Sequence, residues 1–127
     1  MVKKNIDFLY IQDLHESIFP LATPQSQLLH LAEEIGEYLS AETIREAMEE
    51  LADVIIVLVS LRRWKSTRAM SDDLLSKYYF ELPVEERKTM MKFVAQKIQI
   101  VSTRAKLGVY KWDGVDYNRE RYKSILE

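Results

Sequence analysis

Two pairs of carboxylates are the part of the sequence best suited to chemistry. Glu34 and Glu37 form one pair, Glu50 and Asp53 the other. Residues three apart are neighbours on a helix, so each pair would present both carboxylates on one helix face. Carboxylates held close together repel one another, and a divalent cation with oxygen ligands offsets that repulsion. The spacing therefore predicts a metal site, provided that the two pairs face each other.

Magnesium is the cation that this set of residues favours. Mg²⁺ takes a few carboxylates, keeps several waters and completes its shell with substrate phosphates. Zinc or iron would want Cys or His ligands, but the chain has no Cys, and the Glu-x-x-His motif of di-iron bundles is absent. We expect Mg²⁺, with Mn²⁺ as a substitute, to be bound by four carboxylates: Glu34, Glu37, Glu50 and Asp53.

Helices must position these groups, because no stretch alternates in polarity as a strand would. We expect a single all-α domain over residues 1–127, with a first helix from about Asn5 to Ser17. Thr23 is a helix N-cap, followed by Pro24 at the tolerant first position. The second helix carries an apolar stripe typical of a core-facing surface, formed by Leu28, Leu31, Ile35 and Tyr38.

The segment between the two acidic pairs decides whether they can meet. It holds no Gly or Pro, and one continuous helix would separate the pairs by about 24 Å at 1.5 Å per residue. Thr43-Ile44-Arg45-Glu46, however, has the pattern of a capping box, in which Thr43 and Glu46 each bond to the other's backbone. We therefore predict a turn near residues 40–42 and a third helix over about 43–65. The two helices would form an antiparallel hairpin.

The remaining chain completes a helical bundle. The run Val54–Val59 is apolar on every side, so we expect its own bundle or another subunit to cover it. A short fourth helix is expected after Ser71, and a long fifth after Pro83 that ends at Gly108. Its inward positions would be Met90, Val94, Ile98, Val101 and Ala105. An aromatic and basic extension follows over about 109–127, in which Asp116 could cap a last helix.

Composition excludes several classes of protein. With 47% hydrophobic and 30% charged residues, the chain is neither a disordered linker nor a fibre. Its longest apolar run is far shorter than the roughly 20 residues of a membrane helix. The net charge of −2 argues against a general nucleic-acid binder. The lack of Cys fits a reducing compartment. We expect a cytoplasmic protein with no membrane or nucleic-acid partner.

The acidic motifs resemble those of the MazG-like all-α nucleoside triphosphate pyrophosphohydrolases, the group that includes dimeric dUTPases and phosphoribosyl-ATP pyrophosphatases. The family pattern is E-E-x-x-E, a spacer, then E-x-x-D. Here Glu33-Glu34-Ile35-Gly36-Glu37 is followed by twelve residues and Glu50-Leu51-Ala52-Asp53. The resemblance is specific over about residues 27–61, within a motif core of about 23–68.

The resemblance implies Mg²⁺-dependent cleavage of a nucleoside triphosphate to monophosphate and pyrophosphate by a homodimer or homotetramer. Glu34, Glu37, Glu50 and Asp53 would hold the metal, and Glu33 or Glu37 would orient the attacking water. Two alternatives stay open. One is a non-catalytic oligomerisation or adaptor module of the same fold. The other is an enzyme narrowed to dUTP, dCTP or phosphoribosyl-ATP.

Other polar residues are candidates for substrate contacts. Cations that could meet the phosphates come from the fifth helix and its exit: Lys97, Arg104, Lys106 and Lys111. Gln27 and His30, on the face of Glu34, are either a substrate-contacting pair or surface residues. Trp112 could stack on a base or pack in the core.

Overall fold

The computed structural model describes residues 7–108, and these form an all-helical domain. Of the described residues 84% are helical and none is in a strand. The α-helices are α1 (Phe8–Ile18), α2 (Pro24–Leu39), α3 (Ile44–Ser60), α4 (Lys65–Leu75) and α5 (Val84–Lys106). A 3₁₀ turn, η1 (Leu61–Arg63), precedes α4, and a π-helical turn, η2 (Ser76–Phe80), follows it. The prediction of an all-α fold is confirmed.

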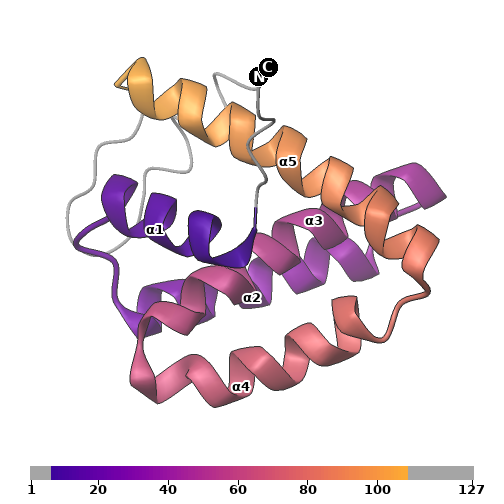
Figure 1. Ribbon diagram of the computed structural model, residues 1–127, viewed down its shortest axis with the longest axis horizontal. Helices are drawn as coiled ribbons and strands as arrows, with labels where there is room; N and C mark the ends of the chain where they lie inside the picture. The colour runs from indigo at the N-terminus through magenta and orange to yellow at the C-terminus, as the bar shows by residue number, and fades with distance from the viewer. Residues whose placement is uncertain (1–6, 109–127) are drawn as a thin grey trace.

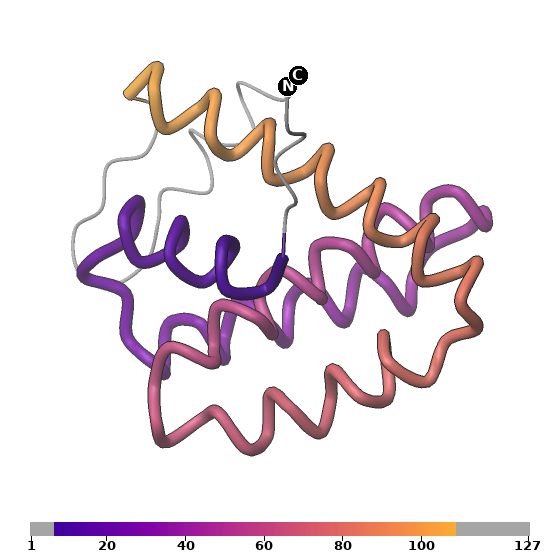
Figure 2. Tube along the Cα trace, in the orientation of Figure 1, coloured from indigo at the N-terminus to yellow at the C-terminus, as the bar shows by residue number. Residues whose placement is uncertain are grey.

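Helix α3 is the centre of the bundle, because α1, α2, α4 and α5 all pack against it. In Figure 1, α5 runs along one side of α3 and α4 along the other. The Cα trace in Figure 2 follows the chain from α4 through η2 and into α5. No helix in residues 7–108 has both the length and the apolar character needed to cross a membrane.

The run Val54–Val59 forms most of the core within a single chain. Val54, Ile55, Leu58 and Val59 have no exposed surface. Ile56 is only partly buried and faces a cavity. The neighbouring helices of the same chain therefore bury most of this segment, and Ile56 is the residue that they leave partly uncovered.

Local capping sets the helix starts that the sequence predicts. Thr23 accepts a hydrogen bond from the Ser26 N–H at 3.1 Å, which starts α2. Thr43 accepts one from the Glu46 N–H at 3.0 Å, which starts α3. The Glu46 carboxylate, however, accepts from the Glu42 N–H at 3.4 Å, so the return half of the predicted box lies one residue earlier.

Several predicted boundaries are wrong. The third helix ends at Ser60 rather than near Lys65, and α4 begins at Lys65 rather than after Ser71. On α2, Leu28 is 36% exposed and so lies outside the buried stripe. Helix α5 begins after Pro83 and stops before Gly108, whose φ of 70° confirms the predicted glycine stop. Asn5 and Asp116 lie outside the described residues.

Candidate functional site

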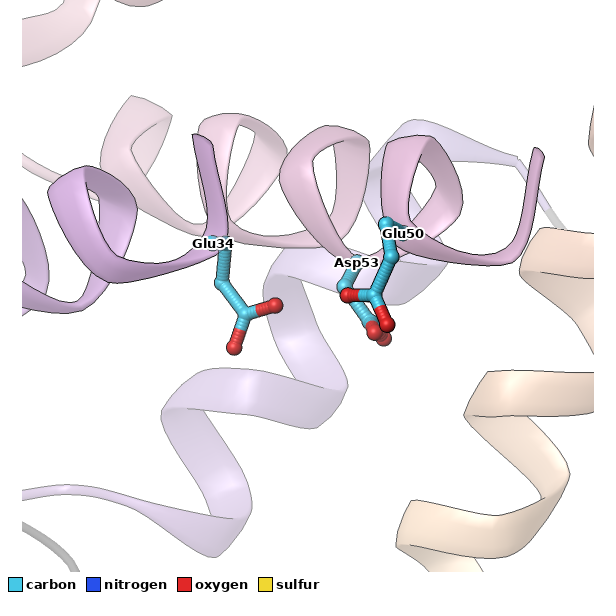
Figure 3. A group of neighbouring side chains, drawn as sticks. All are labelled: Glu34, Glu50 and Asp53. Carbon is cyan, nitrogen blue, oxygen red and sulfur yellow. The ribbon is translucent and has the colours of Figure 1, made fainter. Parts of the chain in front are cut away.

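Carboxylates from α2 and α3 converge at one point. One oxygen from each of Glu34, Glu50 and Asp53 lies within 4.8 Å of the others. Figure 3 shows Glu34 projecting from one helix and the other two side chains from its neighbour, all toward the same side. The structure thus brings together three of the four carboxylates expected to bind metal.

The fourth carboxylate, Glu37, lies at the edge of this group. Its side chain lines the same cavity and is hydrogen-bonded to Glu50. Glu33, the other candidate for orienting water, is not among the residues that line the cavity. Of the two, Glu37 is the one that lines the cavity.

The cavity beside the carboxylates has a volume of about 250 Å³ and is lined by both charged and apolar side chains. Glu34, Glu37, Glu50 and Asp53 form the acidic part of the wall, with Lys97 beside them. Apolar side chains of α1, α3 and α5 form most of the remaining wall: Ile11, Leu14, Ile18, Val57, Ile98 and Val101. Such a wall suits a ligand whose anionic part is held through a cation at the carboxylates and whose uncharged part contacts the apolar side chains.

Two oxygens of these carboxylates have no hydrogen-bond partner among the described residues. They are Glu34 Oε2 and Glu50 Oε2, and both are buried. The other oxygen of Glu34 accepts a hydrogen bond from His30 Nε2 at 3.0 Å, which fixes the orientation of the carboxylate. Buried acceptors without donors are uncommon and costly. A hard divalent cation would satisfy both oxygens, so the residues present fit Mg²⁺.

Burial and mutual repulsion raise the pKa values of two of these groups. Burial raises the pKa of Asp53 to about 6, although Lys97 Nζ, 3.3 Å from Oδ2, opposes the shift. Burial also raises the pKa of Glu50 to about 7, together with the hydrogen bond that its protonated carboxyl donates to Glu37 and the charge of Asp53. Without a cation the site therefore resists carrying its full negative charge at neutral pH.

Glu50→Gln is expected to stabilise the metal-free protein at pH 8 and to change little at pH 4. The folded-state pKa of Glu50 is raised from 4.5 to about 7, so the wild-type protein loses stability as the pH rises through this window. The gain at pH 8 should be about 1 kcal/mol, because solvent screens a carboxylate at the cavity rim. Urea unfolding in chelator at both pH values measures it.

Glu49→Gln is the matched control for this pH dependence. Glu49 is the neighbouring residue on α3, and its exposed side chain pairs with Arg45 at 3.2 Å. Because Glu49 lies outside the carboxylate cluster, its replacement should not give the gain in stability at pH 8 that is expected for Glu50→Gln. A Glu50→Gln protein that is no more stable than wild type at pH 8 would contradict the repulsion inferred here.

Some of the basic residues predicted to meet the phosphates line the cavity and others do not. Lys97 lines the cavity and contacts Asp53, and Arg104 lines it while only 5% exposed. Lys106 is exposed in the last turn of α5 and is not among the lining residues. Lys111 and Trp112 lie outside the described residues.

His15 also lines the cavity and is only partly exposed, although the sequence alone did not identify it as a site residue. Burial lowers its pKa to about 3, with the nearby Arg63 charge acting in the same direction, so the ring is neutral. His15 lies 3.2 Å from Gln27 and 3.3 Å from Arg63. Its place four residues after Ile11, on the inward side of α1, is the signal that could have identified it.

The site combines a carboxylate cluster, a cation beside it and an apolar cavity in one continuous space. It can coordinate a hard cation at the carboxylates and hold an uncharged ring against the apolar side chains. Comparison of the chain with protein families, curated proteins and solved structures gives no match. The likeness to the MazG-like enzymes therefore stays a resemblance, and function has to be inferred from the residues themselves.

Proposed function

We propose that this protein hydrolyses a nucleoside triphosphate to the monophosphate and pyrophosphate with Mg²⁺. The observation that carries the proposal is the convergence of Glu34, Glu50 and Asp53 in the wall of a largely apolar cavity. A nucleotide has the matching form, with a charged phosphate chain and a flat heterocycle. The acidic motifs, which resemble those of the MazG-like family, support the same reaction.

Each residue of the carboxylate cluster has a role in this proposal. Glu34, Glu50 and Asp53 would hold Mg²⁺, with Glu37 beside Glu50. Bound there, the ion would neutralise charge on the phosphate oxygens. Glu37 orients the attacking water and accepts its proton, and it is preferred to Glu33 because it lines the cavity.

The basic residues act on the phosphate chain. Lys97 Nζ lies 3.3 Å from Asp53 and holds that carboxylate in place. Its charge at the cavity wall would also attract the phosphates. Arg104 adds a second, buried cation to the same cavity.

The proposal includes the hairpin and the oligomer that the resemblance implies. Helices α2 and α3 pack together across the connection at residues 40–43, which supports an antiparallel hairpin as the metal-binding unit. Leu29, Leu39 and Ile44 are 59%, 75% and 86% exposed. The resemblance is what favours a homodimer or homotetramer, and these exposed apolar side chains are ones that a subunit interface could cover.

A panel of nucleoside triphosphates tests the function directly. Purified protein is incubated with each triphosphate and Mg²⁺, and pyrophosphate and monophosphate are measured. At least one substrate should yield both products in equal amounts, and a chelator should stop the reaction. Including dUTP, dCTP and phosphoribosyl-ATP separates a broad enzyme from a narrow one. Absence of pyrophosphate from every substrate would favour the non-catalytic module.

A further inference from the structure

A chain of three polar side chains leads from the turn η1 into the cavity. Arg63 Nη1 lies 3.3 Å from His15 Nδ1, and His15 Nε2 lies 3.2 Å from Gln27 Oε1. Arg63 is itself fixed, because Nη1 also donates to the Phe19 carbonyl at 3.0 Å and its guanidinium lies over the Trp64 ring. The far end of the chain, Gln27, lines the cavity and is 1% exposed.

The donors and acceptors of this chain can be arranged in one way only. A guanidinium has donors and no acceptor, so His15 Nδ1 must accept from Arg63. The neutral ring then carries its proton on Nε2, which donates to Gln27 Oε1. The Gln27 amide is thereby prevented from flipping, and its Nε2 group is left buried with no partner among the described residues.

A buried amide donor without a partner indicates a ligand acceptor. The cavity that Gln27 lines also has apolar side chains in its wall, among them Leu14 and Ile18 from α1 and Val101 from α5. A flat, uncharged ring that bears a carbonyl oxygen would fill this space and accept from Gln27. An exocyclic amino group in the same place would bring its own N–H donor against the Gln27 N–H donor, and no hydrogen bond could form.

We propose that Arg63 and His15 are positioning residues that fix Gln27 Nε2 as a donor, so that the cavity selects a pyrimidine base with a keto group at ring position 4 over one with an amino group there. This inference rests on the proposed function in taking the ligand to be a nucleotide. It adds the class of base, and it assigns the choice to a hydrogen-bonded chain outside the acidic motifs.

The test measures binding of uridine and cytidine, which differ in carrying a keto or an amino group at ring position 4. Both lack phosphate, so isothermal titration calorimetry without metal reports on the base alone. Wild-type protein should bind uridine about tenfold more tightly, the ratio expected from one hydrogen bond that cytidine cannot make. Equal affinities, or no binding of either nucleoside, would overturn the inference.

Three variants separate the chain from general effects on folding. Gln27→Glu replaces the donor with an acceptor of the same shape and should reverse the preference toward cytidine. Arg63→Met removes the donor to His15 and should bring the two affinities together, whereas Arg63→Lys should keep the preference. An unchanged preference in Gln27→Glu or in Arg63→Met would overturn the assigned roles.

The base preference and the proposed reaction can fail independently of each other. A protein that releases pyrophosphate but binds both nucleosides equally would keep the proposed reaction and lose the base assignment. One that prefers uridine but hydrolyses no triphosphate would keep the base assignment and lose the reaction.

Discussion

Glu50→Gln is expected to reduce kcat/KM for pyrophosphate release by at least a hundredfold. The substitution removes the charge of one of the three clustered carboxylates and leaves the side chain nearly the same size. Loss of a residue that merely supports a metal ligand typically costs 10- to 100-fold, so loss of a ligand should cost at least the upper value. Steady-state kinetics with the best triphosphate of the panel measures the change.

Glu49→Gln is again the control, and its activity should stay close to that of wild type. A second measurement separates loss of metal from loss of structure. Mg²⁺ at one hundred times its dissociation constant should stabilise the wild-type protein by about 2.7 kcal/mol. Glu50→Gln should lose most of this gain while its helix content, measured by circular dichroism, stays unchanged. Wild-type turnover in Glu50→Gln would remove Glu50 from the site.

Glu50→Gln thus links stability to function in opposite directions. The same substitution should stabilise the metal-free protein at pH 8 and reduce kcat/KM by at least a hundredfold. Clustered carboxylates are costly for the fold when no cation is bound, as the raised pKa values of Glu50 and Asp53 indicate. A site that is destabilising by itself and is relieved by its ligand is typical of functional rather than structural residues.

Features set by a few neighbouring residues could be predicted from the sequence. Thr23 and Thr43 each accept a hydrogen bond from a backbone N–H three residues ahead, so their helices begin where the local pattern indicates. The break before Thr43 is what allows Glu34 to lie beside Glu50 and Asp53. The main element of the site followed from this one local signal.

Features set by long-range contacts could not be predicted. Helix α3 stops at Ser60 with no Gly or Pro nearby, because later side chains bind the carbonyls of its end. Thr67 Oγ1 donates to the Leu61 carbonyl at 2.6 Å, and Ser71 Oγ donates to the Leu58 carbonyl. These bonds start α4 early and hold it against α3, a packing that no short window of sequence reports.

The two parts of the cavity also differ in how well the sequence predicts them. The carboxylates repeat with helical spacing on α2 and α3 and can be found by inspection. The Arg63–His15–Gln27 chain joins three separate elements and depends on how α1 packs across the bundle. Gln27 was a candidate for substrate contact from its place near Glu34. Its hydrogen-bond partner is His15, which lies on a different helix. The nearby His30 on the same helix bonds to Glu34 instead.

Leu58→Ala is expected to reduce the free energy of unfolding by about 2–5 kcal/mol. Leu58 lies in the last turn of α3, has no exposed surface and belongs to the core around which the other helices pack. Truncation to Ala leaves a cavity there, and a natural domain has only about 5–15 kcal/mol in total. Urea unfolding followed by circular dichroism measures the loss.

Val84→Ala is the control, because Val84 lies at the start of α5, is 53% exposed and is not among the residues proposed for a subunit interface. It should change stability by no more than about 0.5 kcal/mol. Sedimentation velocity then distinguishes a core residue from an interface residue. If the apolar run of α3 forms the core of one chain, Leu58→Ala should lower stability and leave association of the folded protein unchanged. A variant with wild-type stability but weakened association would instead assign Leu58 to an interface between subunits.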